Sequence, residues 1–332
     1  MIRRRLQTIP LTILLWVAVT LLMPLLTLAV VLIDAARKLI TGRPFIATRL
    51  LAIGWVYLAA QVGVIILSAG QWVASLPSGR KAAARRCQWS YWLQGKWVAT
   101  IMAAMKRLFR LDFVVSGADD VAPGPIIVLF RHVSIMDNLL PHAFVSEPNN
   151  LRLRWVLKKE LLRDPALDIG GNRMPNYFVD RKSDDSQVQL EGIAALGSGL
   201  GPGDGVLLFP EGTRFSEKRR KYRLDRLAAS DPDLHKLIAP FEQVLPPKTG
   251  GVLALLDTGA DVIVAAHAGF EELRGIKEIW AAAPVGRTIS MAFRRYPASD
   301  IPRDPAARKQ WLFSAWAWVG SEVASMRAHT AN

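Results

Sequence analysis

The sequence has very little cysteine and is short of acidic residues. Cys87 is the single cysteine among 332 residues, which excludes an internal disulfide framework and a zinc site built from cysteines. Charged residues make up 21%, a little below the usual quarter, and 28 Asp and Glu face 42 Lys and Arg, a net charge of +14. Disorder requires low hydrophobicity, and 51% of this chain is hydrophobic. A chain both apolar and basic is typical of a protein that faces a lipid membrane.

Two long stretches, Leu6–Ile33 and Leu50–Gly79, contain no charged residue. A helix needs about 20 apolar residues to cross a bilayer core of roughly 30 Å, so both stretches are long enough. The apolar part of a cleaved signal peptide is shorter, about 7–15 residues. We therefore expect a hydrophobic helical hairpin in the membrane over residues 1–79, kinked near Pro24 because proline removes a backbone donor.

Basic residues flank both stretches, and lysine and arginine near a membrane span favour the cytoplasmic side. Arg3, Arg4 and Arg5 precede the first stretch, Arg37, Lys38, Arg43 and Arg49 lie between the two, and Arg80, Lys81, Arg85 and Arg86 follow the second. Two full spans place the outer clusters in the cytoplasm but the middle cluster on the far side. A kinked hairpin that only dips into the bilayer keeps all three near one leaflet, and the sequence leaves both topologies open. We expect an inner, cytoplasmic membrane, with the rest of the chain facing the cytoplasm.

Residues 80–110 predict a basic, tryptophan-rich amphipathic helix. Its apolar side chains recur at helical spacing: Trp89, Leu93, Trp97, Ile101, Met105 and Leu108. Such a helix suits the lipid headgroup region, where cations meet anionic lipids. The alternative is a helix that packs on the neighbouring domain and turns a solvated basic face outwards. Nucleic-acid binding also uses a basic patch but predicts no hydrophobic hairpin, so we expect no nucleic-acid partner.

Residues 111–332 predict one α/β domain. Residues 1–76 carry seven basic and one acidic side chain, so the remainder keeps a net charge of +8 and is long enough for a sizeable core. Short apolar runs predict strands, and helical patterns cover 187–196 and 305–326. The runs are Ile126–Phe130, Val206–Phe209, Val262–Ala266 and Ile289–Phe293. Continuous apolar strands are buried on both faces, which favours a mixed, mainly parallel sheet covered by helices.

The first of two polar blocks that follow a predicted strand holds a candidate general base. In this block, residues 131–138 (RHVSIMDN), His132 can accept a proton near neutral pH, and a carboxylate on its other ring nitrogen would orient it. Asp137 comes five residues later, about 500° around a regular helix, so the two do not share a helix face. They meet if His132 lies in the turn after the strand and Asp137 in the first helical turn. Ser134 lacks the G-x-S-x-G setting of a nucleophile, which favours a single-step transfer to a substrate hydroxyl.

The second block, Phe209–Arg214 (FPEGTR), predicts anion recognition. Arg214 offers a planar, permanently charged fork that suits phosphate, and Gly212 lets the backbone approach a ligand closely. Glu211 is interpreted as binding a hydroxyl or orienting Arg214. The glycine-rich segment 197–203 precedes its strand, so it is interpreted as a connection and not a nucleotide loop. No metal-binding motif is present, and no metal site is expected.

Four blocks in order resemble the glycerolipid acyltransferase family, typified by 1-acylglycerol-3-phosphate acyltransferases of the PlsC type. They are His132-x4-Asp137, the VLKKEL segment 156–161, Phe178–Arg181 (FVDR) and FPEGTR. The resemblance covers roughly residues 110–295. It implies a glycerol-3-phosphate acyltransferase-like fold and a membrane-bound O-acyltransferase that acts in phospholipid synthesis or remodelling.

The resemblance also implies a role for each matching residue. His132 would deprotonate the hydroxyl of a lysophospholipid, which attacks the thioester of acyl-CoA or acyl carrier protein, and Asp137 would orient His132. The residues implied to bind the acceptor's head group are Arg181, Glu211, Gly212, Thr213 and Arg214, with Lys158 or Lys159 assisting through charge. The implied partners are membrane lipids, the acceptor and the acyl donor. The family's chemistry uses no metal and no redox cofactor.

The sequence departs from the family pattern at two places. Arg131 stands where asparagine commonly precedes the histidine, and Leu245–Gly251 (LPPKTGG) is more similar to a block of the longer lysophospholipid acyltransferases. The acceptor therefore stays open between lysophosphatidic acid and another lysophospholipid such as lysophosphatidylglycerol. A thioesterase that uses the same base on water and a non-enzymatic membrane scaffold are the rival functions, and the scaffold does not explain the four blocks. His267, after a buried strand, is interpreted as structural.

Overall fold

The computed structural model describes residues 2–180 and 186–331. The chain divides into two compact units. One unit consists of Met1–Leu111, Lys158–Asn176 and Ile276–Arg287, and the other of Asp112–Leu157, Tyr177–Gly275 and Thr288–Asn332. The first is helical, and the second contains the sheet. We call them the helical unit and the sheet unit.

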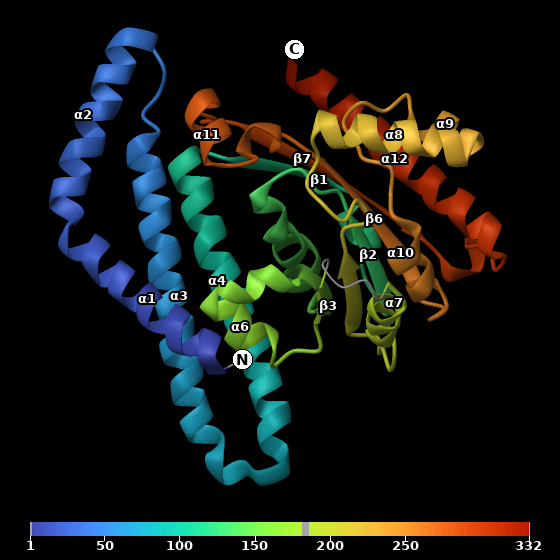
Figure 1. Cartoon of the computed structure of the whole chain (residues 1–332), viewed down its shortest axis with the longest axis horizontal. Coiled ribbons are helices and arrows are strands. Elements are labelled where there is room, and N and C mark those ends of the chain that lie inside the picture. Colours follow the sequence, from blue (N-terminus) through green and yellow to red (C-terminus); the bar gives the residue numbers. More distant parts are fainter. Residues whose placement is uncertain (1, 181–185, 332) are drawn as a thin grey trace. The chain divides into compact units, whose positions relative to one another are not determined.

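The sheet unit is built on a seven-stranded sheet in the order β1-β7-β6-β2-β5-β3-β4 (Figure 1). The strands are β1 (Asp112–Ser116), β2 (Ile126–Phe130), β3 (Arg152–Lys158), β4 (Tyr177–Val179), β5 (Asp204–Leu208), β6 (Asp261–Ala268) and β7 (Thr288–Tyr296). β2 pairs in parallel with both β5 and β6, β3 pairs in parallel with β5, and β1 with β7, whereas β6 and β7 are antiparallel. The mixed, mainly parallel sheet that the sequence predicts is confirmed.

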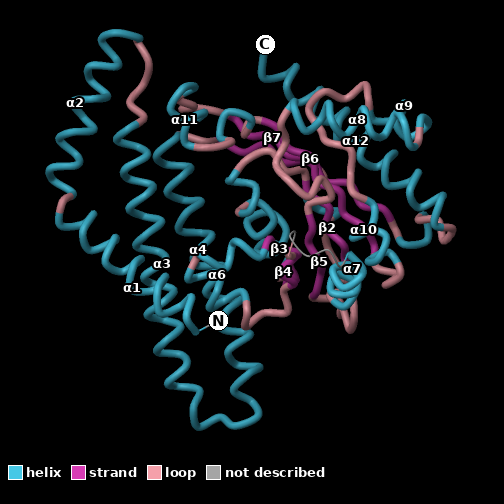
Figure 2. The backbone as a smooth tube through the Cα atoms, in the orientation of Figure 1, coloured by secondary structure: helices cyan, strands magenta, loops and turns pink. Residues whose placement is uncertain are grey.

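Helices cover this sheet and close its core. They include α7 (Ser186–Ala195), α8 (Glu217–Ser230), α9 (Pro232–Ile238), α10 (Thr249–Leu256) and α12 (Pro305–Ala331). Figure 2 shows α7, α10 and α12 beside the strands. Alternate residues of β2 and β6, such as Ile127 and Val264, pack in one cluster with Trp316 of α12, and all three are fully buried. The four predicted strands and both predicted helices are confirmed.

The helical unit begins with four long helices: α1 (Ile2–Leu21), α2 (Met23–Thr41), α3 (Ala47–Ser75) and α4 (Ala82–Phe109). The first hydrophobic stretch is divided between α1 and α2, which meet at a bend of 69°. Pro24 lies in the first turn of α2, so the predicted kink is confirmed. By length and composition, α3 qualifies as a membrane span, and α1 with α2 qualifies only as a bent pair.

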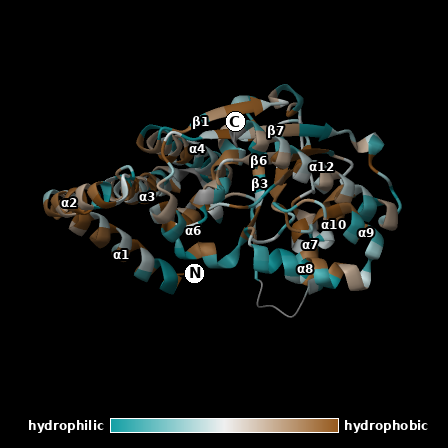
Figure 3. Cartoon of the chain, turned by 90° about the horizontal axis from the view of Figure 1, so that it is seen from above, coloured by the Kyte–Doolittle hydropathy of each residue, from teal (hydrophilic) through white to brown (hydrophobic). Residues whose placement is uncertain are grey.

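The remaining elements of the helical unit are short. They are the 3₁₀ turns at Leu76–Lys81 and Lys159–Arg163 and the helices α6 (Pro165–Gly171) and α11 (Ile276–Ala282). Hydrophobic residues run along α1, α2 and α3 (Figure 3), and many of their large apolar side chains are exposed, including Leu25, Leu32 and Ile66. Exposed leucines in such numbers are unusual for a surface in water.

The predicted helix over residues 80–110 is α4. Leu93, Ile101 and Met105 of its apolar stripe are buried, and α4 packs along α3. Packing against α3 within the unit therefore accounts for part of the stripe. Lys96 is exposed, and so is Trp92, at 45%. The membrane-surface role of α4 stays a prediction.

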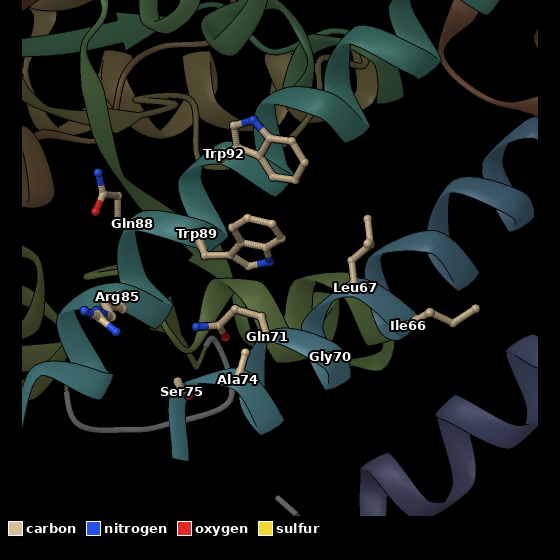
Figure 4. A pocket seen from close by; sticks show the side chains of 10 residues that line it. All are labelled: Ile66, Leu67, Gly70, Gln71, Ala74, Ser75, Arg85, Gln88, Trp89 and Trp92. Atoms are coloured by element: carbon tan, nitrogen blue, oxygen red, sulfur yellow. The ribbon is translucent and has the colours of Figure 1, made fainter. Parts of the chain in front are cut away.

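A cavity of about 800 Å³ lies between α3 and α4. In Figure 4, Arg85, Gln71 and Ser75 lie toward one end, and Trp92 and Leu67 lie toward the other. The remaining lining residues are Ile66, Gly70, Ala74, Gln88 and Trp89. The cavity is thus apolar at one end and carries a cation at the other.

Two buried carboxylates hold the helices of this unit together. Asp34 of α2 is 1% exposed and accepts hydrogen bonds from the backbone N–H groups of residues 46–48, at the start of α3. Asp168 of α6 is fully buried, with its oxygens 2.6 Å from Arg4 Nη2 and 3.1 Å from Arg5 Nε of α1. Both carboxylates are compensated, as buried charges must be.

Candidate active site

Three adjacent parallel strands bring the two polar blocks to one edge of the sheet. β2, β5 and β6 run in the same direction, with Leu129 level with Leu208 and with Val264. Residues 131–138 follow β2 and Phe209–Arg214 follow β5, so both blocks begin at the carboxyl ends of the strands. This edge is where ligands commonly bind in α/β sheets.

His132 and Asp137 meet at this edge. His132 lies in the turn after β2, and Asp137 lies in a 3₁₀ turn, Ile135–Asn138, with its Oδ2 3.0 Å from His132 Nδ1. This is the arrangement in which the sequence predicts contact. Asp137 is fully buried, whereas the His132 side chain is 17% exposed. Because the carboxylate engages Nδ1, that nitrogen carries the proton, and Nε2 is left with a lone pair.

The loop around this pair is fixed by its own polar groups. Asp137 Oδ2 also accepts hydrogen bonds from the N–H groups of Val133 (2.5 Å) and Ser134 (2.7 Å). The Ser134 hydroxyl is buried, donates to the Leu273 carbonyl and accepts from the Met136 N–H. Ser134 therefore caps the turn, and its hydroxyl hydrogen is given to the Leu273 carbonyl.

The Glu211 side chain binds the backbone at His132. One carboxylate oxygen accepts from the backbone N–H of His132 (3.0 Å) and the other from that of Leu245 (3.1 Å), and the side chain is fully buried. Burial raises the pKa of Glu211 to about 7, although Arg131 and the two N–H groups lower it. Glu211 thus holds the backbone of the His132 loop, and the ligand contact that the resemblance implies for it stays a prediction.

The turn after β5 carries exposed cations. Gly212 adopts φ +62°, and a Cβ there would approach Lys248 Cδ to 3.2 Å, so the turn requires glycine. Arg214 is exposed and donates from Nη1 to the Arg274 carbonyl at 2.6 Å, and Thr213 beside it is half-buried. Lys248 is exposed, and its N–H donates to the Pro210 carbonyl (2.8 Å). The sequence signal that could have identified Lys248 as a second cation beside Arg214 is its position in the LPPKTGG block.

The two blocks are linked directly. The N–H of Phe215, just after FPEGTR, donates to the His132 carbonyl at 2.8 Å, and the His132 ring stacks on Phe209 with the ring centres 4.4 Å apart. The second block therefore contacts both the backbone of His132, through Glu211 and Phe215, and its imidazole ring, through Phe209. The turn after β5 and His132 therefore form one site.

Three predicted residues are not placed at this site. Arg181 lies outside the described residues. Lys158 and Lys159 belong to the helical unit, where Lys158 Nζ lies 3.2 Å from Glu160 Oε1. Their implied roles stay predictions.

A buried charged cluster behind the pair was not predicted. Arg131 is fully buried and donates to Glu271 Oε1 (2.8 Å), to the Gln243 carbonyl and to the His267 carbonyl. Burial raises the pKa of Glu271, but Arg131 outweighs it and brings that pKa to about 2. The cluster ties the end of β2 to the loops after β6 and before α10. The sequence feature that could have indicated this cluster is Arg131, a charged residue directly after the wholly apolar strand Ile126–Phe130.

A histidine whose Nδ1 contacts a buried carboxylate, at the end of a parallel strand and beside a cationic turn, can accept a proton from a hydroxyl at Nε2. Comparisons with known proteins show what the chain is similar to. A model of the family described as Acyltransferase matches residues 112–267. Lysocardiolipin acyltransferase 1 of Danio rerio is 22% identical over 228 residues, which are 66% of this chain and 57% of that protein. The 1-acyl-sn-glycerol-3-phosphate acyltransferase gamma of Mus musculus is 27% identical over 192 residues, 56% of this chain and 49% of that protein.

The fold also has a solved counterpart. The crystal structure of the 1-acyl-sn-glycerophosphate acyltransferase PlsC from Thermotoga maritima superposes with a TM-score of 0.54 at 18% identity, over 84% of this chain and 96% of that one. The solved structure shows the fold alone, and the match of residues 112–267 to the Acyltransferase family model agrees with the family that the four blocks resemble. The aligned segments span only about half to three fifths of the curated relatives' own length.

Proposed function

We propose that the protein is a membrane-bound O-acyltransferase. It moves a fatty acyl group from acyl-CoA or acyl carrier protein to the free hydroxyl of a lysophospholipid, 1-acylglycerol-3-phosphate or a relative. The observation that carries the proposal is the 3.0 Å contact of His132 Nδ1 with Asp137, at a turn tied to FPEGTR. The names of the curated relatives support the same class of reaction.

The proposed reaction is a single transfer. His132 Nε2 accepts the proton of the acceptor hydroxyl as its oxygen attacks the thioester carbonyl, and Asp137 stabilises the imidazolium that forms. When the tetrahedral intermediate collapses, the carbon–sulfur bond breaks, and His132 returns the proton to the departing thiolate. An ester and a free thiol result, and the step needs no metal and no redox cofactor.

Arg214 and Lys248 are proposed to bind the acceptor's phosphate. Both are exposed cations of the turn that contacts His132, and the guanidinium of Arg214 has N–H groups beyond the one given to Arg274. Thr213 would add a hydroxyl donor on the same turn. Arg181 joins this set from its FVDR block alone.

The helical unit is proposed to anchor the enzyme in an inner, cytoplasmic membrane, with the site on the cytoplasmic side. The supporting features are the length and apolarity of α3 and the exposed leucines of α1 and α2. The basic residues that follow α3, among them Arg85, suit the cytoplasmic lipid surface. Anchoring would bring the enzyme to an acceptor whose acyl chain is dissolved in the bilayer.

One experiment tests the function. The protein, purified in detergent, is offered a panel of lysophospholipids with acyl-CoA and acyl carrier protein donors, and the ester product is measured. Wild type should form product, His132→Ala should reduce it by at least about 10³-fold, and the exposed His329→Ala should serve as the matched control with full activity. Transfer by His132→Ala at the wild-type rate would refute the proposed base.

The same assay separates the rival functions. A thioesterase releases free fatty acid at the same rate without any acceptor, and that release depends on His132. A membrane scaffold shows neither product, and its partners bind His132→Ala as they bind wild type.

A further inference from the structure

His267 lies behind the His132–Asp137 pair, on the strand next to β2. It is fully buried near the end of β6, with Nε2 3.1 Å from the Arg131 carbonyl oxygen and 3.5 Å from Asp137 Oδ1. The sequence interpretation of His267 as structural took no account of this neighbour, which is 130 positions away along the chain.

The protonation state of His267 follows from its surroundings. Burial lowers its pKa, and Arg131 acts in the same direction, while Asp137 and Glu271 oppose. The ring is therefore neutral near pH 7 and carries one proton. A carbonyl oxygen can only accept, so the proton is on Nε2. Nδ1, which has no hydrogen-bond partner within residues 2–180 and 186–331, is then an unprotonated nitrogen.

The two oxygens of Asp137 are used unequally. Oδ2 serves His132 Nδ1 and two backbone N–H groups, whereas Oδ1 is buried and has no hydrogen-bond partner in the described part of the chain. The Nε2–H of His267 is 3.5 Å from that oxygen, just beyond a good hydrogen bond. A shift of a few tenths of an ångström brings it to bonding distance.

We infer that His267 is a positioning residue of the proposed acyl transfer: its one Nε2–H is shared between the Arg131 carbonyl and Asp137 Oδ1, and it holds the carboxylate so that Oδ2 stays on His132 Nδ1 throughout the proton transfer. The inference rests on the proposed function. The carboxylate can rotate about its last bond, and backbone N–H groups hold it on one side only. β6 supplies the support on the other side, from a strand in direct register with β2.

Two substitutions at position 267 test the role. His267→Gln can place an N–H close to the position of Nε2, whereas His267→Leu fills the space and has no donor. We expect kcat of the Leu variant to fall about tenfold to hundredfold, the range for one hydrogen bond to a charged group, with KM unchanged. The Gln variant should retain kcat within a few-fold.

The pH dependence of kcat/KM separates the proposed role from a packing defect, because a packing defect alone does not change the pKa of His132. With Asp137 less firmly held, the imidazolium of His132 loses stabilisation, so the pH at which kcat/KM reaches half its maximum should move lower in His267→Leu. The other charges near His267, Arg131 and Glu271, are the same in both variants. An unchanged profile and kcat in the Leu variant, or equal losses in both variants with matching drops in thermal stability, would overturn the inference.

A measurement on the wild type decides the question if the Leu variant does not fold. The chain has five histidines, so ¹⁵N-histidine labelling gives few signals, and His267→Gln assigns the one that disappears. We expect a neutral Nε2–H ring at pH 7 whose shift changes in Asp137→Asn. A charged ring, an Nδ1–H tautomer or no response to Asp137→Asn contradicts the inference. If the wild type forms no ester at all, the proposed function fails, whatever the ring shows.

Discussion

Glu211 gives a prediction about stability that carries a definite sign. Its pKa is raised from 4.5 in the unfolded chain to about 7 in the folded protein, chiefly because the carboxyl is buried. Between these two pH values the folded chain keeps a proton that the unfolded chain has released. The free energy of unfolding therefore falls as the pH rises through this window. The contribution of Glu211 is complete below pH 4.5 and is lost above about pH 7.

The size of the effect follows from the shift. One pKa unit corresponds to about 1.4 kcal/mol, so the free energy of unfolding should fall by up to about 3 kcal/mol between pH 4.5 and pH 7. Glu211→Gln removes the titration. At pH 5 the variant should be less stable than the wild type by about 1–3 kcal/mol. The hydroxyl oxygen of the protonated carboxyl can still accept from a backbone N–H, whereas the NH2 group of the amide turns a donor toward the N–H of His132 or Leu245. As the pH rises to 8, the wild type loses stability and the gap should close.

Urea unfolding at pH 5, 6, 7 and 8, in the same detergent for both proteins, measures this gap. His267 has a lowered pKa, so its own contribution is lost as the pH falls below 6.5, the opposite direction, and Glu271 titrates near pH 2 to 4.5. Both groups are present in both proteins and cancel in the difference. A gap that stays constant from pH 5 to 8 would show that Glu211 is ionised throughout, and the reasoning from its burial would be wrong.

Three further outcomes are expected. Gly212→Ala forces a left-handed backbone on alanine and presses its Cβ against Lys248, which should cost about 1–2 kcal/mol in urea unfolding and reduce transfer; unaltered stability contradicts the positive φ. Arg214→Lys keeps the charge but loses the fork, so KM for a phosphate-bearing acceptor should rise about tenfold with donor KM unchanged, and a change confined to the donor contradicts the assignment. Asp168→Asn weakens the pair with Arg4 and should lower the melting temperature at pH 7 by an amount worth roughly 1–3 kcal/mol. Burial raises the pKa of Asp168, but Arg4 and Arg5 lower it by more, so the net pKa lies below the ordinary value. The stability advantage of the wild type over Asp168→Asn should therefore shrink as the pH falls toward 4. An advantage that does not depend on pH argues against the ion pair.

Much of the fold was readable from short-range patterns. Continuous apolar runs located β2, β5, β6 and β7, because strands buried on both faces need apolar side chains at every position. β1, β3 and β4 were missed. β1 alternates exposed and half-buried residues, and β3 begins with Arg152 and Arg154 in alternation with Leu153 and Trp155. Such short, mixed segments do not differ from loops in one sequence.

The site divides in the same way. His132 and Asp137 are five residues apart, so their contact depends on one local turn and was predictable. Glu211 reaches the His132 N–H across 79 positions, and His267 reaches the Arg131 carbonyl across 136. Those contacts are set by the register of β5 and β6 against β2, which no local spacing reveals. The local sequence therefore does not reveal that the Glu211 carboxyl accepts hydrogen bonds from two distant backbone N–H groups.

Asp34 has a consequence for how the chain is made. The first N–H groups of α3 have no partner within their own helix, and it is a carboxylate of α2 that binds three of them. Neither helix is complete without the other: α2 alone carries an uncompensated charge, and α3 alone has unpaired N–H donors at its start. If the helical unit is the proposed membrane anchor, the lowest-energy route into a bilayer during synthesis is for the two helices to pair first and insert together, with the joint at residues 42–46 already closed.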